Sequence, residues 1–264
     1  MSSQAAADDE VVLQVDGALA TITLNRPERL NSQTPATWLR LAAVGAGLDP
    51  GIRVIVVRGA GRAFSAGLDQ SLFTTDPEVA GGLAALASGC DDEIEERIAE
   101  FQAGFSWLTQ GSAISIAAVQ GHAIGAGFQL ALACDLRVLT EDATLTMAET
   151  SLGLVPDLTG TAPLVRAVGY SRALEICATG RRVGATEAAA LGLATAVVPA
   201  DQLTDAVQDL VAALLSAPAA AVAATKQLLL GAGDRTRLEQ NAAERQAQLS
   251  MLRLLATREP LGDT

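Results

Sequence analysis

Residues 113–135 read AISIAAVQGHAIGAGFQLALACD, and this stretch decides the fold class. Residues 113–119 are small or apolar except for Ser115, which is the pattern of a buried strand. Three glycines follow, and a helical apolar run then extends from Phe128 to Ala133. A strand that passes through glycines into a helix leaves unpaired N–H groups at the positive end of the helix dipole. The stretch predicts a site for an anion or for a developing oxyanion, or else a close-packed turn without a ligand.

The composition is that of one large domain, or of a domain with a helical appendage, with 264 residues of which half are apolar. The net charge of −12 argues against nucleic acid or an anionic membrane surface as the main partner. No apolar run reaches the length of a transmembrane helix. Residues 1–10, MSSQAAADDE, are acidic and lack an apolar core, so we expect a frayed tail and no signal peptide.

Cysteine and histidine usage narrows the chemistry. Cys90, Cys134 and Cys177 are odd in number and far apart, which is typical of reduced thiols in the cytoplasm. Neither a CxxC pair nor a zinc-ligand spacing is present, so the sequence predicts no metal site. His122 is the only histidine, and acid–base chemistry therefore falls mainly to carboxylates.

Short strand–strand–helix units recur in the first two-thirds of the chain, and helices follow, which indicates an α/β fold. Asp16-Gly17 between two apolar runs predicts a hairpin, and Thr34 before Pro35 predicts a helix start. Predicted strands cover residues 11–15, 18–24, 53–59, 113–119, 136–139, 143–147 and 193–198. Predicted helices cover 35–48, 128–133, 172–179 and 186–192, with others starting at 93 and 160; Thr186 is the expected N-cap of the fourth.

Two further segments are organised differently. Residues 71–92 read as a loose connection with at most a short helix, which is typical of a functional lid or a mobile loop. From residue 201 onward the chain reads as helices broken at Pro218 and at 231–233. The last helix, 235–258, is amphipathic, and alanine-rich helices of this kind often pack against another subunit.

A second glycine-rich segment, GAGRAFSAGLD at 59–69, follows another predicted strand. It is not a dinucleotide-binding fingerprint, because Phe64 stands where the third glycine is required. The residues around Ser65 resemble a hydrolase nucleophile elbow only weakly, since Ala63 replaces a glycine and a single histidine is available. The segment therefore predicts exposed backbone donors rather than a nucleophile.

Residues 149–160, ETSLGLVPDLTG, hold two carboxylates in mostly apolar surroundings. A carboxyl group that is partly stripped of water has a raised pKa and can act as an acid or a base near neutral pH. Glu149 and Asp157 are therefore candidate catalytic groups. The alternative for each is a capping or surface role, which suits Asp157 better because a predicted helix follows it.

Taken together, the motifs of this chain resemble those of the crotonase superfamily, also called the enoyl-CoA hydratase/isomerase family. The resemblance runs from about Val11 to the last helix and is specific because several motifs recur in order. They are Asn25-Arg26-Pro27-Glu28 with Leu30-Asn31, the residues AFSAGLD at 63–69, GHAIGAG at 121–127, Cys134-Asp135, and Glu149 with Gly153 and Pro156.

The resemblance implies a spiral of ββα units over 11–199 that binds acyl-CoA, and a helical trimerisation region over 200–264. It implies a homotrimer or a hexamer of two trimers, with no cofactor apart from the coenzyme A of the substrate. The backbone N–H groups of Leu68 and Ala126 would hold the thioester oxygen. Coenzyme A contacts are implied for Arg29, Ala66, Asp69 and Lys226. Lys226 is the only lysine in the chain, and a solvated surface lysine is the alternative.

The chain departs from the pattern of a typical hydratase at three positions. Gln129 replaces one of two glutamates that hold and activate water, and an amide cannot take a proton from water. Ala126 replaces a glycine, which keeps the donor N–H but narrows the site slightly. Asp157 replaces a glycine and is similar to the second acid of dienoyl-CoA isomerases, although those enzymes also carry an acid at the position of Gln129.

The sequence therefore predicts isomerisation of an enoyl- or dienoyl-CoA, with Glu149 as the main base and acid and Asp157 as the second. Hydration is the nearest alternative, with Gln129 only orienting a water molecule. The residues are also compatible with another enolate reaction, with a non-catalytic acyl-CoA binding protein and, more distantly, with a nicotinamide-dependent oxidoreductase.

Overall fold

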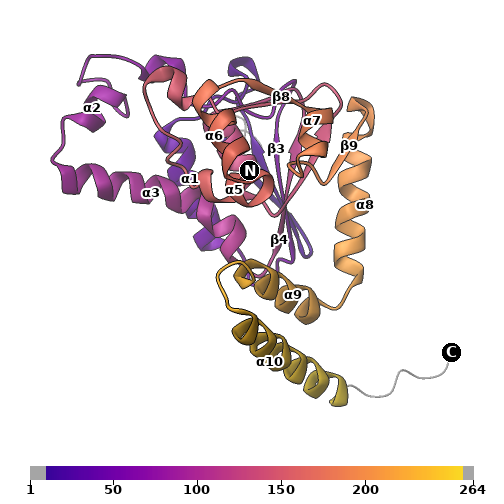
Figure 1. The fold of residues 1–264 in the computed structure, drawn as a ribbon. Coiled ribbons are helices and arrows are strands. Elements are labelled where there is room, and N and C mark those ends of the chain that lie inside the picture. The colour runs from indigo at the N-terminus through magenta and orange to yellow at the C-terminus, as the bar shows by residue number, and fades with distance from the viewer. Residues whose placement is uncertain (1–9, 258–264) are drawn as a thin grey trace, which may run out of the picture. The chain divides into compact units, whose positions relative to one another are not determined.

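The computed structural model describes residues 10–257 (Figure 1), so nearly all of the predicted N-terminal tail lies outside the described residues. The chain divides into two compact units, one up to Val211 and one from Ala212. This boundary falls within α8 (Leu203–Ser216), whereas the sequence places it between residues 199 and 200.

The main sheet of the first unit has six strands in the order β1-β2-β3-β4-β6-β9. β1 (Val11–Asp16) and β2 (Leu19–Leu24) form the predicted hairpin, and Asp16 pairs with Leu19. The two turn residues are therefore Gly17 and Ala18, one position later than predicted, because Gly17 has a φ of 55°. The other strands run parallel to β2: β3 (Val54–Gly59), β4 (Ile114–Val119), β6 (Leu136–Thr140) and β9 (Ala196–Val198).

A second, three-stranded sheet lies in the order β5-β7-β8. It consists of β5 (His122–Ile124), β7 (Thr144–Thr146) and β8 (Arg182–Gly184). The sequence predicted only β7, because three-residue strands are too short to show an alternating pattern. β8 also corrects the expected start of the next helix. Gly184, in extended conformation, is the N-cap of α7 (Ala185–Ala190), and Thr186 lies inside its first turn.

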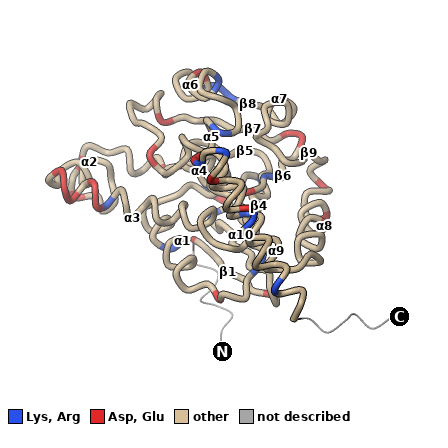
Figure 2. The backbone as a smooth tube through the Cα atoms, turned by 60° about the horizontal axis from the view of Figure 1, so that its bottom comes forward, with Lys and Arg blue, Asp and Glu red and all other residues tan. Residues whose placement is uncertain are grey.

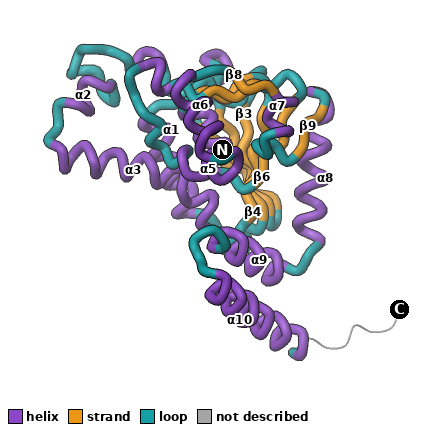
Figure 3. The backbone as a smooth tube through the Cα atoms, in the orientation of Figure 1, coloured by secondary structure: helices purple, strands orange, loops and turns teal. Residues whose placement is uncertain are grey.

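Helices cover the main sheet (Figures 1 and 3). α1 (Pro35–Gly47) starts as predicted, with the Thr34 hydroxyl accepting from the Thr37 N–H. It packs against α3 (Asp91–Gln110), whose Phe101 ring meets Trp38 edge-on with centroids 4.9 Å apart. The predicted loose connection contains the 3-10 turn Gln70–Leu72 and the short helix α2 (Leu83–Ala87). The α1–α3 pair thus fixes one side of the core, and the segment with α2 leads into α3.

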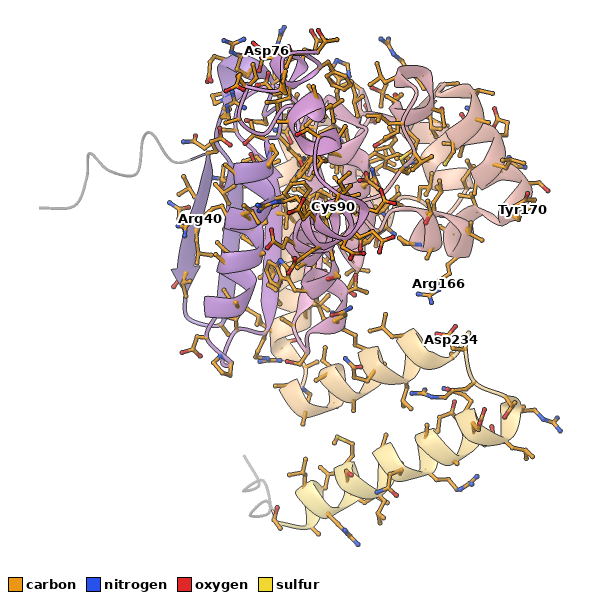
Figure 4. All side chains as sticks on the ribbon, turned by 90° about the vertical axis from the view of Figure 1, so that its left-hand side faces the viewer. Arg40, Asp76, Cys90, Arg166, Tyr170 and Asp234 are labelled. Carbon is orange, nitrogen blue, oxygen red and sulfur yellow. The ribbon has the colours of Figure 1, made fainter. Side chains whose placement is uncertain are left out.

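Three further helices of the first unit lie within residues 113–135 or follow them. α4 (Ala126–Ala133) is wholly buried and leads into β6. The 3-10 turn Glu149–Leu152 follows β7, and α5 (Thr161–Val168) and α6 (Tyr170–Thr179) come next, with Gly180 ending α6 in left-handed conformation. Figure 4 shows Tyr170 at the surface of α6.

The second unit is helical, with α9 (Ala219–Gly231) packed against α10 (Arg237–Ala256). α10 begins in a capping box between Thr236 and Glu239. Several leucines of α10 are exposed: Leu238, Leu249, Leu252, Leu254 and Leu255. Within residues 10–257 no single helix has the length and apolar character needed to cross a bilayer; α9 and the helical segment 200–216 reach them only as a sharply bent pair.

Candidate active site

The two glycine-rich segments of the sequence meet backbone to backbone. The Ser65 N–H donates to the His122 carbonyl at 2.9 Å, and the Ile124 N–H donates to the Ser65 carbonyl at 3.0 Å. Gly67 has a φ of +85°, and a Cβ on it would lie 2.5 Å from the Ile124 carbonyl oxygen. Only glycine tolerates both this positive φ and this close contact with the Ile124 carbonyl. Gly67 therefore allows the turn that carries Leu68 to pack directly against the start of α4.

Two backbone donors lie at this junction. The N–H groups on either side of Leu68 are engaged, since Gly67 donates to Ser65 Oγ at 3.2 Å and Asp69 donates to the Gln33 carbonyl at 2.9 Å. The N–H of Leu68 has no hydrogen-bond partner among the described residues. Ala126 is the first residue of α4, where helical N–H groups are unpaired. The missing Cβ of Gly67 would lie 3.6 Å from the Ala126 nitrogen, so the structure brings together the two predicted donors.

Glu149 lies beside these donors. A Cβ on Gly125, which precedes Ala126, would lie 3.2 Å from Glu149 Oε1. Oε1 accepts a hydrogen bond from Gln129 Nε2 at 2.7 Å, whereas Oε2 is buried and has no partner among the described residues. Burial raises the pKa of Glu149, and the charge of Asp157 raises it further, while the bond from Gln129 opposes both. One oxygen of the Glu149 carboxylate is thus fixed by Gln129, and the other is left without a partner among the described residues.

Gln129 is a positioning residue for both acids. Its side-chain oxygen accepts from the backbone N–H groups of Leu158 at 2.8 Å and Gly160 at 3.3 Å, and its amide nitrogen donates to Glu149. Those two N–H groups flank Thr159, whose φ of +67° is strained for a β-branched residue. In the hydration alternative Gln129 orients a water molecule. Its amide oxygen and one amide hydrogen are used inside the protein, which leaves the second amide hydrogen for that role.

Asp157 lies in the segment that Gln129 holds. Its carbonyl accepts from Gln102 Nε2 on α3 at 2.7 Å, which ties the segment to a second element. Burial raises the pKa of the Asp157 carboxyl. The capping alternative for Asp157 is wrong, because α5 starts after Gly160 and has no side-chain cap. Asp157 therefore lies near enough to Glu149 to raise its pKa, and the Asp157 carboxylate has no side-chain hydrogen bond or ion pair within residues 10–257.

A cavity of about 570 Å³ opens next to Leu68, between α1, α2 and α3. This size is ordinary for a small-molecule site. Its wall is mainly apolar, with Trp38, Leu39, Ile94 and Phe101. Its rim is charged, with Glu93, Glu96, Arg97 and Glu100. Figure 2 shows acidic residues gathered at this end of α3, and Figure 4 looks onto its first turn, next to Cys90. Among residues 10–257, no three histidine, cysteine or acidic side chains are grouped so as to hold a metal ion.

Comparison with known proteins decides the family. The sequence profile of the enoyl-CoA hydratase/isomerase family matches residues 14–259 of this chain. The chain belongs to the enoyl-CoA hydratase/isomerase family. It is 36% identical to a Mycobacterium tuberculosis protein named as an enoyl-CoA hydratase, over 84% of this chain and 76% of that protein. A Thermus thermophilus protein of the same name is 34% identical over 83% of each chain.

Solved structures confirm the fold class. A Thermobifida fusca protein named as an enoyl-CoA hydratase, crystallised with CoA, superimposes with a TM-score of 0.89 at 48% identity, over 96% of each chain. The same protein crystallised with acetoacetyl-CoA superimposes with a TM-score of 0.88. The predicted crotonase-like α/β fold with C-terminal helices is therefore confirmed. Trimerisation stays a prediction.

The four predicted CoA-contact residues of this family member differ in setting. Arg29 is exposed at the end of the 3-10 turn Pro27–Arg29, and Ala66 is half-buried with its N–H donating to the Leu30 carbonyl. Lys226 lies on α9 in the second unit and is only 5% exposed, so it is not the solvated lysine of the alternative. CoA contact by these residues stays a prediction.

The Asp69 side chain has a task inside the protein. It pairs with Arg26 at 3.0 Å and accepts from Ser32 and Ser71. Burial alone would raise the pKa of Asp69, but these hydrogen bonds lower it to about 2. The carboxylate therefore braces the turn after Leu68, and its predicted contact with CoA stays untested.

Gln129→Glu is expected to move the acid limb of the kcat/KM profile to higher pH. The new carboxylate would face Glu149 Oε1 across the 2.7 Å that an amide now bridges. Two carboxylates at that distance do not both ionise readily, so the pKa of Glu149 rises further. With Glu149 as the predicted base, only its ionised form accepts a proton, so activity below that pKa is expected to fall. A kcat/KM profile over the acidic and neutral range, with the exposed Gln110→Glu as control, checks this, and an unmoved acid limb contradicts it.

Proposed function

We propose that this family member isomerises an enoyl-CoA or dienoyl-CoA by moving a proton along the acyl chain. The observation that carries the proposal is the pair of carboxyl groups of the buried Glu149 and the partly buried Asp157, each with a raised pKa, beside two backbone donors that are unpaired among the described residues. The CoA and acetoacetyl-CoA complexes of the Thermobifida fusca relative support an acyl-CoA thioester as the substrate.

In the proposed reaction the thioester oxygen accepts from the N–H groups of Leu68 and Ala126. This polarisation makes the α-carbon acidic. Glu149 Oε2 removes a proton from the α-carbon, and the electron pair of that C–H bond moves into an enolate whose charge both donors stabilise. Glu149 or Asp157 then returns a proton to the γ-carbon of an enoyl-CoA, or to the ε-carbon of a 3,5-dienoyl-CoA, and each double bond ends one position closer to the thioester. One proton leaves and one returns, so no oxidant or added reactant is needed.

Hydration of a 2-enoyl-CoA is the second candidate, favoured by the names of the relatives. It would use Glu149 to activate water. Gln129 could contribute only its second amide hydrogen, because the rest of its amide group is engaged. General acid–base help is worth about 10²–10⁴-fold, so a missing second carboxylate favours isomerisation over hydration.

Asp157→Asn is expected to slow deuterium exchange at the γ-carbon by about 10²-fold or more and to affect exchange at the α-carbon less. The reason is that the second acid is lost while Glu149 keeps its contacts. Proton NMR in D₂O with 2-enoyl-, 3-enoyl- and 3,5-dienoyl-CoA measures both sites. The exposed Asp142→Asn is the control.

Different outcomes of the same experiment would replace the proposal. A 3-hydroxyacyl-CoA product from the wild-type protein would make it a hydratase. Line broadening without any turnover would make it an acyl-CoA binding protein. Binding of a nicotinamide nucleotide would revive the oxidoreductase hypothesis.

We also propose that the second unit mediates a homotrimer or a hexamer in the cytoplasm. The exposed leucines of α10 and the family resemblance support this assembly. Light scattering coupled to size-exclusion chromatography tests it, and a monomer would contradict it.

A further inference from the structure

One chain of hydrogen bonds joins the wall of the cavity to the donor turn. The Trp38 indole N–H donates to Gln33 Oε1 at 2.8 Å. Gln33 Nε2 donates to Ser65 Oγ at 3.0 Å. Ser65 Oγ in turn accepts from the N–H of Gly67 at 3.2 Å. The next N–H along the backbone is that of Leu68.

The backbone of Gln33 forms hydrogen bonds to the same turn on both sides of Leu68. Its N–H donates to the Gly67 carbonyl at 2.7 Å, and its carbonyl accepts from the Asp69 N–H at 2.9 Å. The peptide unit between Gly67 and Leu68 and the one between Leu68 and Asp69 are therefore both fixed by Gln33. The direction of the Leu68 N–H follows from the position of this one residue.

The chain of bonds is sealed from solvent. Gln33 and Ser65 are fully buried, and each side-chain polar atom in the chain has a partner. Buried polar networks of this kind are rigid, and a broken link leaves a costly unpaired group. A displacement of the Trp38 ring is therefore passed to Gln33 rather than absorbed by water.

The Trp38 ring also lines the cavity, together with Leu68 and Phe101. The ring meets Phe101 edge-on and its indole N–H donates to Gln33, so Trp38 connects the cavity wall to Gln33.

We propose that Trp38 and Gln33 are positioning residues that couple the filling of the cavity to the aim of the Leu68 N–H. This inference rests on the proposed binding of an acyl-CoA at that donor. An acyl group that fits the cavity would fix the position of the Trp38 ring. Through Gln33, the fixed ring would keep the Leu68 N–H pointed at the thioester oxygen. The enzyme would then choose among acyl groups through the strength of carbonyl polarisation as well as through binding.

The test uses the carbonyl stretch of bound, unreactive acyl-CoA esters labelled with ¹³C at the thioester. The wild-type protein is expected to shift the stretch of hexanoyl-CoA to lower frequency more than that of acetyl-CoA. Trp38→Phe keeps an aromatic ring but removes the indole N–H, so it is expected to give both esters the same smaller shift. Its kcat on a six-carbon substrate is expected to fall about tenfold, part of the roughly 10²–10³-fold that a lost donor costs. KM is expected to change little.

Trp107→Phe is the matched control, since its indole N–H donates to the Gly104 carbonyl at 3.1 Å and has no link to Gln33. Ser65→Ala breaks the same chain one step further along and keeps the test decisive if Trp38→Phe does not fold. Equal shifts of both esters in the wild-type protein, or an unchanged pattern in both variants, would overturn the inference. Failure of the wild-type protein to bind either ester would instead overturn the proposed function.

Discussion

Glu149→Gln is expected to lower kcat by about 10³-fold while leaving the Kd of an acyl-CoA within about twofold, because general acid–base help is worth roughly 10²–10⁴-fold. The substitution keeps an oxygen that can accept from Gln129, so the site retains its shape. It removes the only described carboxylate that faces the donors with an unpartnered oxygen. Steady-state kinetics on the best isomerisation substrate, with calorimetry for binding, measures the two effects separately.

The exposed Glu141→Gln serves as the control for this experiment and should leave kcat unchanged. Wild-type activity should also rise with pH through a value above the ordinary range of a glutamate, because the pKa of Glu149 is raised by burial. Persistent binding with unchanged turnover in Glu149→Gln would favour catalysis by another group. If the wild-type protein also lacked turnover, the hypothesis of a non-catalytic binding protein would hold.

Gly67→Ala is expected to lower kcat by about 10²–10³-fold, which is the typical effect of losing one oxyanion donor. A methyl group there would lie 2.5 Å from the Ile124 carbonyl oxygen and would demand a φ of +85° from alanine. The turn must move away from α4, and the Leu68 N–H moves with it. Kinetics together with the carbonyl stretch of a bound acyl-CoA measures both the rate and the polarisation.

Gly47→Ala is the matched control, since a methyl group at Gly47 meets nothing within 4 Å and no positive φ is needed. It should leave both kcat and the carbonyl shift unchanged. A Gly67→Ala protein that keeps its carbonyl shift but loses activity would show that the turn serves a purpose other than polarisation.

The parts of the fold that could be predicted from sequence are those with local signals. The hairpin follows from alternation around Asp16-Gly17, and the helix after Thr34 follows from its cap and from Pro35. The strand, glycines and helix of residues 113–135 were predicted correctly, apart from the short β5 between them. β5 and β8 were not predicted, because a strand of three residues shows no periodicity in the sequence. Both strands are defined by their pairing with β7.

Sequence motifs predict which residues form the candidate site, but they do not predict the hydrogen bonds that connect those residues. Leu68, Ala126, Glu149 and Asp157 were predicted through motifs and apolar surroundings, and their roles stay predictions. The role of Gln129 as a brace depends on contacts with residues 20 to 31 positions away, which no local pattern encodes. Gln33 carried no signal at all, because a single glutamine between a loop and a helix resembles any polar linker residue.

Both proposed oxyanion donors are main-chain N–H groups, which every substitution except one to proline retains. Genetic drift can therefore exchange the acids around them, as with an amide at position 129 and an acid at 157, without deleting the element that makes a thioester reactive. A fold that holds its oxyanion donors in the main chain can still stabilise an enolate after the acidic side chains around it have changed. A new reaction can then arise from a single change of side chain, because the enolate on which it acts is already stabilised.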